Sequence, residues 1–169
     1  LSGRGAAPGE AAAAALAPFG DQFIYYPCDV QSREGLQKLW DASREHWGTV
    51  DIWISNAGRN TPHSPVWETG ESYTRQVIGT NILGMVFGAQ IAAAEMIRQG
   101  HGAIWAMEGL GSNNMIQPKT ILYGTTKHAL TYFMKGLARE LAGSGVTAGR
   151  LSPGMMLTDF ITKTPDGTV

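Results

Sequence analysis

The sequence predicts an α/β protein built on a doubly wound parallel sheet that is truncated at both ends. Short apolar runs that suit buried strands alternate with longer runs of helical periodicity along the whole chain. The apolar runs contain few polar residues, which is typical of parallel strands covered on both faces. No repeat, linker or change of composition divides the 169 residues, so we expect one domain over residues 1–169.

The first part of the chain contains three predicted strands. Residues 1–4 resemble the end of a strand that leads into a glycine-rich turn, and residues 10–16 are alanine-rich and helix-forming. The aromatic and β-branched run 22–28 predicts a second strand. Ser32 suits the N-cap of a second helix, and the apolar run 50–55 after that helix predicts a third strand.

The second part of the chain continues the alternation. In order, we predict a loop at 59–70, a helix at 71–99, a strand at 102–107, a loop at 108–118, a helix at 123–141 and a strand at 146–151. The helix at 71–99 is rich in glycine and alanine, so we expect other elements to approach it on several sides. In open parallel sheets, ligands bind at the carboxyl ends of the strands, where the loops that follow the strands gather.

The composition excludes several classes of protein. A net charge of −1 with scattered basic residues gives no electrostatic footprint for nucleic acid or an anionic membrane. The single cysteine, Cys28, excludes an internal disulfide, suits a reducing compartment and is expected to be buried. The 4 histidines lack metal-ligand spacing, so no metal is expected. Glycine and polar residues interrupt the most apolar stretch, 78–97, and neither a membrane span nor a signal peptide is predicted.

Tyr123 and Lys127 lie four residues apart at the start of a predicted helix. This spacing puts the phenol and the ammonium on one face of the helix, one turn apart. A tyrosine with its reference pKa of about 10 is a poor acid or base at neutral pH, but a nearby positive charge lowers that pKa. We therefore expect Tyr123 to exchange a proton with a carbonyl or an alcohol. The alternative is a surface tyrosine beside a solvated lysine.

A series of motifs resembles the short-chain dehydrogenase/reductase family. The motifs are Asn56-Ala57-Gly58 after a strand, Asn81 in Thr80-Asn81-Ile82-Leu83-Gly84, Tyr123-Gly124-Thr125-Thr126-Lys127, and Pro153-Gly154 with Thr158. Each motif alone is weak, but their order and spacing match along nearly the whole chain. The resemblance implies a Rossmann-like domain and an NAD(P)-dependent oxidoreductase.

The resemblance implies catalytic roles for three residues. Tyr123 matches the general acid/base, and Lys127 matches the residue that lowers the tyrosine pKa and holds the hydroxyl groups of the nicotinamide ribose. Asn81 matches the helix residue that fixes a water molecule in the proton relay. The alternative for Asn81 is a buried polar residue at a kink in the helix.

The resemblance also implies a set of cofactor contacts. Asn56-Ala57-Gly58 matches the turn under the adenosine ribose, where glycine permits a close approach. Asp29-Val30 matches the pair that contacts the adenine ring, although Asp29 equally suits the cap of a turn or a helix. Pro153-Gly154 and Thr158 match the segment that binds the carboxamide of the nicotinamide.

Arg4 lies where the family selects its cofactor. A guanidinium group suits a 2′-phosphate, which it grips with two parallel hydrogen bonds, whereas an acidic residue would favour the free 2′-hydroxyl. We therefore expect NADP(H) rather than NAD(H). The alternative is that Arg4 is a solvated loop cation.

The sequence departs from the family pattern in two ways. It lacks the glycine-rich turn that cradles the cofactor pyrophosphate, and it lacks the last strand and the substrate-covering helix. Because the chain also opens without a methionine, we expect it to be part of a longer protein. The family's catalytic serine usually lies thirteen residues before the tyrosine, a position that Leu110 holds here. Ser112 can polarise a carbonyl only if its loop bends inward, and otherwise it is a plain loop serine.

The loop that contains Ser112 narrows the resemblance. Residues 107–112, 123–127 and 152–159 are similar to the corresponding motifs of the chlorophyll b reductases of plants and green algae. Those enzymes reduce the 7-formyl group of chlorophyll b to a hydroxymethyl group with NADPH. The resemblance implies NADPH-dependent reduction of a carbonyl with Tyr123 as the general acid.

Further expectations concern partners and alternatives. Candidates to meet a flat apolar substrate are Trp67, Trp105, Met155 and Met156. The alternative is that they belong to the core, which is favoured for Trp105 and open for the others. Helices 71–99 and 123–141 resemble the family's oligomer-forming pair, so we expect a homo-oligomer. The expected location is intracellular: a plastid if the narrower resemblance holds, and otherwise the cytoplasm. The alternative functions are a non-catalytic, reductase-like subunit of a larger assembly and a generic alcohol or ketone dehydrogenase.

Overall fold

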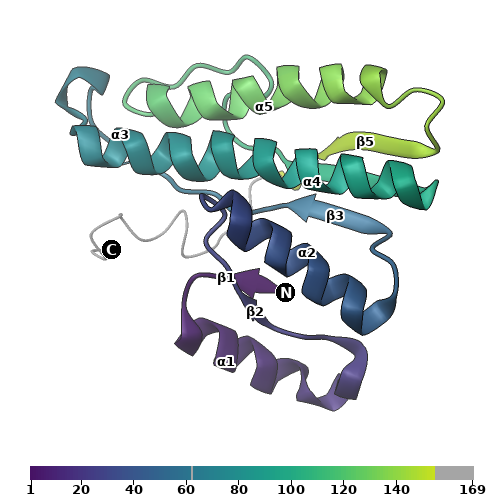
Figure 1. The fold of residues 1–169 in the computed structure, drawn as a ribbon. Coiled ribbons are helices and arrows are strands. Elements are labelled where there is room, and N and C mark those ends of the chain that lie inside the picture. The colour runs from purple at the N-terminus through teal and green to yellow at the C-terminus, as the bar shows by residue number, and fades with distance from the viewer. Residues whose placement is uncertain (62, 155–169) are drawn as a thin grey trace.

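The computed structural model describes residues 1–61 and 63–154 (Figure 1). Parallel strands alternate with helices, as the sequence predicts, but the strands form two separate sheets. The strands are β1 (Ser2–Gly3), β2 (Tyr26–Pro27), β3 (Ile52–Ser55), β4 (Gly102–Met107) and β5 (Val146–Leu151). Strand β1 pairs with β2, and β4 lies between β3 and β5, all in parallel orientation.

The helices follow the predicted segments closely. Those of the described chain are α1 (Ala6–Leu16), α2 (Arg33–Trp47), α3 (Glu71–Ile78), α4 (Gly84–Gln99) and α5 (Ile121–Glu140). Ser32 caps α2 as predicted, because its hydroxyl oxygen accepts a hydrogen bond of 3.0 Å from the Gly35 amide. The predicted helix 71–99 contains a π-helical turn, Gly79–Leu83, between α3 and α4. Such turns occur frequently at functional sites.

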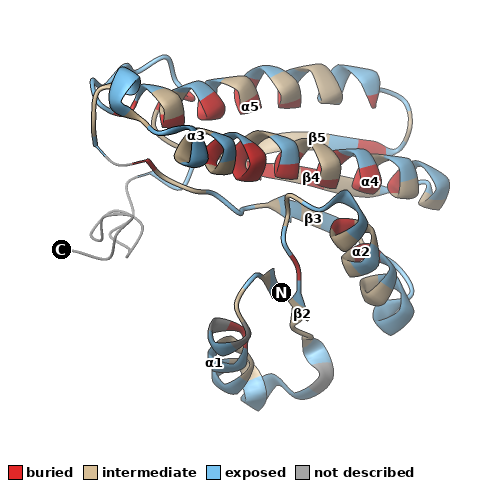
Figure 2. Ribbon diagram, turned by 60° about the vertical axis from the view of Figure 1, so that its left-hand side comes forward, coloured by how far each residue is buried: buried red, intermediate tan, exposed pale blue. Residues whose placement is uncertain are grey.

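The hydrophobic core lies in one layer of helices on the three-stranded sheet. Helix α4 packs on β3 and β4, α5 packs on β5, and α2 packs beside α4. Fully buried side chains come from each of these elements: Trp40 from α2, Met96 from α4, Ile104 from β4 and Met134 from α5. Burying side chains of this size stabilises the fold by about 2–3 kcal/mol each. Figure 2 shows buried residues concentrated here, whereas α1 and β2 are mostly exposed or half-buried.

The strand predicted at 22–28 is shorter in the structure. Only Tyr26–Pro27 form β2, and a 3₁₀ turn, Ala17–Gln22, precedes them. The amino group of Leu1 donates a hydrogen bond of 2.8 Å to the Ile24 carbonyl oxygen. Strand β1 pairs with the two residues of β2, Ser2 with Tyr26 and Gly3 with Pro27.

Within residues 1–61 and 63–154, strand β3 is covered on one face only, so this part of the sequence prediction is wrong for the described chain. Ile52 and Ile54 are 61% and 50% exposed, whereas Trp53 between them turns toward Gly88 of α4. A cleft of about 1070 Å³ lies between β3 and the two-stranded sheet and is lined by residues from both. The described chain therefore places two sheets on either side of an open volume.

The helical segment Glu71–Gln99 is long and apolar enough to cross a membrane by length and composition alone. In this fold its second half, α4, packs against β3, β4 and α2, and its most apolar part is 61% buried. Contact with neighbouring elements on several sides accounts for its apolar composition, as its glycine and alanine content predicts. It is the central core helix.

Candidate active site

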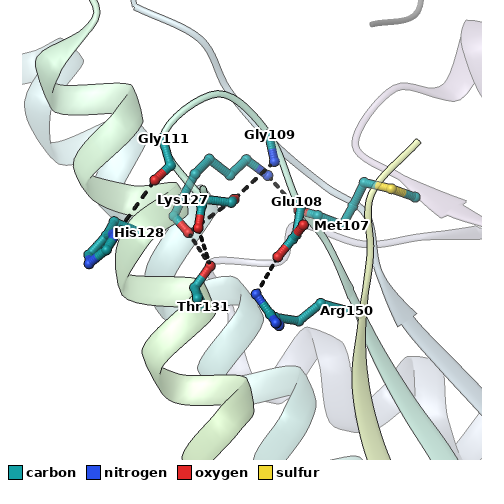
Figure 3. Close-up of polar contacts among 9 residues, drawn as sticks. Met107, Glu108, Gly109, Gly111, Lys127, His128, Thr131 and Arg150 are labelled. Atoms are coloured by element: carbon teal, nitrogen blue, oxygen red, sulfur yellow. Dashed lines mark hydrogen bonds and ion pairs between the residues drawn. The ribbon is translucent and has the colours of Figure 1, made fainter. Parts of the chain in front are cut away.

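Tyr123 and Lys127 lie side by side on the first turns of α5, at the carboxyl end of β4. The Lys127 Nζ atom is 5.8 Å from the centre of the Tyr123 ring, so the two side chains share one helical face as their spacing predicts. The same Nζ atom donates a hydrogen bond of 2.9 Å to the Met107 carbonyl oxygen (Figure 3). Both residues are buried, with exposures of 8% and 5%. The pair is therefore a fixed, largely dry feature.

The electrostatics of the pair differ from the sequence prediction. Burial raises the pKa of Tyr123 above its ordinary value, and burial lowers the pKa of Lys127. The expectation of a lowered pKa for Tyr123 is therefore wrong for this arrangement, because burial removes the phenol from water. A phenol in this environment is protonated at neutral pH and is a weaker acid than an ordinary tyrosine.

Asn81 lies in the π-helical turn and joins three parts of the chain. Its Oδ1 atom accepts a hydrogen bond of 2.7 Å from the Arg59 amide, and its Nδ2 atom donates one of 3.0 Å to the Arg59 carbonyl oxygen. The Nδ2 atom also donates a hydrogen bond of 3.0 Å to the Thr126 hydroxyl. Thr126 in turn donates one of 2.7 Å to the Tyr123 carbonyl oxygen. Sequence reasoning missed Thr126, although it lies inside the Tyr–Lys motif.

The cleft between the two sheets brings together five of the eleven predicted cofactor residues. Its lining includes Arg4, Val30 and the turn 56–58, together with Met107 at the end of β4. Gly58 connects the cleft to the catalytic candidates, because a Cβ atom built on it would lie 3.9 Å from both Asn81 Oδ1 and Lys127 Nζ. The loops that follow β1, β2 and β3 therefore meet at one edge, as the sequence predicts.

These residues fit a dinucleotide. The volume of the cleft, about 1070 Å³, is slightly above the range typical of cofactor sites, which is about 300–1,000 Å³. A guanidinium lies at one side of the cleft, at Arg4. The buried ammonium of Lys127 and the buried amide of Asn81 lie beside Gly58, where no side chain fills the space. Cationic and hydrogen-bonding groups at separate points of one cleft match a ligand that carries both phosphates and ribose hydroxyls.

The other predicted cofactor residues lie outside the cleft lining, and Tyr123 and Lys127 are among them. The Asp29 carboxylate accepts a hydrogen bond of 3.0 Å from the Gln31 amide, which is the turn cap that was its alternative. Pro153 and Gly154 follow β5 and are exposed. Thr158 lies outside the described residues, as do Met155 and Met156.

The turn that carries Arg4 is held in place by Tyr25. The Tyr25 hydroxyl lies 2.9 Å from the Gly3 carbonyl oxygen and 2.7 Å from the Gly5 carbonyl oxygen, on both sides of Arg4. Its ring packs on α1, where a Cβ atom at Gly9 would lie 2.1 Å from it. Sequence reasoning missed Tyr25, whose only signal is the cluster of glycines around Arg4.

Ser112 is turned inward and is 7% exposed. Its hydroxyl oxygen accepts a hydrogen bond of 3.1 Å from the Gly109 amide and donates one of 3.3 Å to the Lys127 carbonyl oxygen. Leu110, at the position of the family's usual serine, is half-buried. The loop therefore directs the Ser112 hydroxyl toward α5.

The fold and the site together define an α/β protein of the dinucleotide-binding type, with a buried tyrosine and lysine at the end of its cleft. The family profile described as "short chain dehydrogenase" matches residues 1–168. The chain therefore belongs to the short-chain dehydrogenase family.

Two plant proteins are among its relatives. The "Probable chlorophyll(ide) b reductase NYC1, chloroplastic" of Oryza sativa subsp. japonica is 35% identical over 135 residues, which are 79% of this chain and 27% of that protein. The "Chlorophyll(ide) b reductase NOL, chloroplastic" of the same organism is 34% identical over 149 residues, covering 85% of this chain and 43% of that protein. The chain thus spans less than half the length of these relatives.

Solved structures share the fold. The structure of ElxO with NADP bound superposes with a TM-score of 0.86 at 26% identity, covering 95% of this chain and 64% of that chain. A short-chain dehydrogenase/reductase from Burkholderia phymatum in complex with NAD has a TM-score of 0.88 at 24% identity, covering 95% and 57%, and is a likeness of fold alone. The described fold is therefore truncated relative to these proteins.

Proposed function

We propose that this chain is part of a reductase that reduces a carbonyl group with a nicotinamide cofactor. In this reaction Tyr123 protonates the carbonyl oxygen. The observation that carries the proposal is the buried Tyr123–Lys127 pair beside the cleft. Burying an ammonium is costly, and an apolar residue would fill the same space in a purely structural core. This cost weighs against the alternative of a non-catalytic, reductase-like subunit.

The chain's own residues bind, orient and supply a proton. Arg4, Val30 and the turn 56–58 would hold the cofactor, which supplies the hydride when it is bound. Lys127 extends its ammonium toward the edge of the cleft at Gly58, where it would hold ribose hydroxyls. Tyr123 is protonated at neutral pH, and its hydroxyl can give a proton to a developing alkoxide because an alkoxide is a stronger base than a phenolate.

Asn81 has a supporting role in the proposed mechanism. Its amide holds the backbone at Arg59, directly after the 56–58 turn, and contacts Thr126 between Tyr123 and Lys127. It therefore fixes the separation between the cofactor turn and the proton donor. The Ser112 hydroxyl accepts one hydrogen bond and donates another inside the protein, so we assign it no contact with the substrate.

We propose NADP(H) as the preferred cofactor because of the guanidinium of Arg4. Similar solved structures hold NADP in one case and NAD in another, so the fold is compatible with either. In Arg4→Asp, the ratio of NADPH to NADH affinity should fall by about tenfold or more, since a bidentate contact is replaced by repulsion. An unchanged ratio would show that the 2′-phosphate is held elsewhere.

We propose a formyl group on a large flat pigment, as in the 7-formyl group of chlorophyll b, as the substrate. The support is the similarity to the two chlorophyll(ide) b reductases. Trp67, which is 83% exposed, offers an indole surface for such a ligand. The chloroplast location in the names of those relatives makes a plastid the proposed compartment.

The test uses the full-length protein with chlorophyllide b and NADPH, and chromatography measures the loss of the formyl pigment. Tyr123→Phe should lower kcat by about 10²–10⁴-fold and leave the Kd for NADPH within about twofold. The matched control is Tyr132→Phe, because Tyr132 lies on the same helix and is 83% exposed. Turnover retained in Tyr123→Phe would remove Tyr123 from the mechanism. Preferential reduction of small ketones would favour the generic dehydrogenase instead.

We also propose a homo-oligomer formed through helices 71–99 and 123–141. Apolar side chains remain exposed on this pair of helices, with Leu83 44%, Ile97 49% and Tyr132 83% exposed. Exposed apolar side chains on adjacent helices suit an isologous interface. Light scattering that shows a monomer of the full-length protein would contradict this.

A further inference from the structure

The loop after β4 lies against two turns of α5. The Gly111 carbonyl oxygen is 3.4 Å from His128 Nδ1, and the Thr131 hydroxyl donates a hydrogen bond of 3.3 Å to the Ser112 carbonyl oxygen (Figure 3). At the other end of the loop, the Glu108 amide donates a hydrogen bond of 2.8 Å to the Leu151 carbonyl oxygen, and its carboxylate pairs with Arg150. The loop is thus tied to α5 on one side and to β5 on the other.

Gly109 is the point at which this loop meets the catalytic candidates. A Cβ atom built on Gly109 would lie 2.5 Å from the Tyr123 hydroxyl oxygen, and 3.2 Å from Cε of Lys127. A separation of 2.5 Å is shorter than real contacts allow, so the phenol occupies space that only glycine leaves free. Gly109 does not have a positive φ, so alanine tests this space without straining the backbone.

Ser112 holds Gly109 in that position. The Gly109 amide donates to the Ser112 hydroxyl oxygen at 3.1 Å, and the Ser112 amide donates back to the Gly109 carbonyl oxygen at 3.0 Å. The Ser112 hydroxyl then donates to the Lys127 carbonyl oxygen at 3.3 Å. One side chain therefore joins the loop backbone next to the phenol to the helix that carries both Tyr123 and Lys127.

We propose that Gly109 fixes the position and water access of the Tyr123 hydroxyl, and that Ser112 is a positioning residue that acts through Gly109. The proposed function treats Tyr123 as the proton donor, and the effect on turnover rests on that function. The effect on the phenol itself does not. Leu110 has no hydroxyl, so the loop positions the Tyr123 hydroxyl through its backbone and through Gly109.

A methyl group at position 109 must displace the phenol, because its oxygen is the far end of a side chain that can rotate. Displacement toward the cleft returns water to the hydroxyl group. Since burial is what raises the pKa of Tyr123, Gly109→Ala should lower that pKa toward its ordinary value. A shift of the donor by about 1 Å can cost about 10²-fold in rate.

The first experiment follows Tyr123 alone. Protein labelled with carbon-13 at the tyrosine Cζ is titrated by nuclear magnetic resonance from about pH 8 to about pH 11.5, and Tyr123→Phe assigns the signal. Gly109→Ala should lower the Tyr123 pKa. The control Gly136→Ala should not lower it, because a Cβ atom at Gly136 would meet nothing within 4 Å, although Gly136 lies on the same helix as Tyr123. An unchanged Tyr123 titration in Gly109→Ala overturns the proposal.

The second experiment separates positioning from direct catalysis by Ser112. Ser112→Ala should lower the Tyr123 pKa and reduce kcat about tenfold with KM within about twofold, and Ser112→Thr, which keeps the hydroxyl, should restore both. This pair also carries the test if Gly109→Ala fails to fold. A fall in kcat of more than about 10²-fold in Ser112→Ala with an unchanged Tyr123 titration would mean that Ser112 contacts the substrate, and it would overturn the assignment.

The two experiments distinguish this inference from the proposed function. If the wild-type protein reduces no carbonyl compound but the titration of Tyr123 still shifts in Gly109→Ala and not in Gly136→Ala, the positioning of the phenol stands and the proposed reaction is wrong. If the wild-type protein is active and the titration does not move, the proposed reaction stands and the inference about Gly109 is wrong.

Discussion

Replacing Asn81 with alanine removes the amide that ties the central helix to α5 and to the backbone after β3. Hydrogen bonds of 2.7, 3.0 and 3.0 Å are lost, and the Arg59 amide and carbonyl lose this partner. A typical hydrogen bond contributes about 1 kcal/mol net, and a buried polar group left unpaired costs about 1–3 kcal/mol. Asn81 is 3% exposed, but Gly58 beside it borders the cleft, so water can reach part of the gap. We therefore expect the free energy of unfolding to fall by about 3 kcal/mol.

Urea denaturation followed by circular dichroism measures this loss. The matched control is Gln37→Ala, because the Gln37 amide donates a hydrogen bond of 3.0 Å to Asp41 on the exposed surface of α2. The control should change the free energy of unfolding by less than about 0.5 kcal/mol. A loss below about 1 kcal/mol in Asn81→Ala, or an equal loss in the control, would refute the view that this amide is a structural junction of the site.

Two further predictions concern the loop and the phenol. Gly111 has a φ of +103°, and a Cβ atom there would lie 2.6 Å from the backbone of α5, so Gly111→Ala should destabilise the fold by about 2–4 kcal/mol in thermal melts. Gly136→Ala should be neutral or stabilising by up to about 1 kcal/mol, and comparable losses in both would contradict the contact. The folded-state pKa of Tyr123 is raised above its ordinary value, so its contribution to stability is present below about pH 10 and is lost as the pH rises through the folded value. The difference in free energy of unfolding between wild type and Tyr123→Phe should therefore shrink above about pH 10 in urea titrations, and a constant difference would show that the phenol is not buried.

The elements of this fold could be predicted because local patterns determine them. Ser32 caps α2 in the way its place before a helical period indicates, and the apolar run 102–107 is a strand of the predicted length. The same applies to the shared face of Tyr123 and Lys127, which four-residue spacing alone determines. Periodicity and spacing describe residues within one helix or strand. These features can therefore be predicted from the sequence without knowledge of contacts between elements.

The features that could not be predicted depend on contacts between elements. The sign of the pKa shift at Tyr123 is set by burial under a distant loop, and the Tyr–Lys spacing carries no information about that burial. The π-helical turn at Asn81 accompanies bonds to Arg59 and Thr126, which lie 22 and 45 residues away in the chain. Likewise, the exposure of Ile52 follows from which helices cover the sheet, whereas its apolar run predicted burial on both faces.

The two sides of the cleft differ in how they are attached, and this separates cofactor choice from proton transfer. Tyr123, Lys127 and Asn81 all belong to the layer that shares the hydrophobic core, whereas Arg4 lies on a turn held by the Tyr25 hydroxyl beside a two-stranded sheet. A change at Arg4 can therefore alter the contact with a 2′-phosphate without moving the core that positions the phenol. A change at Asn81 acts on the core itself, so it should lower stability and turnover together. Cofactor selectivity and proton donation are thus expected to respond independently to mutation, because no described hydrogen bond joins the Arg4 turn to α5.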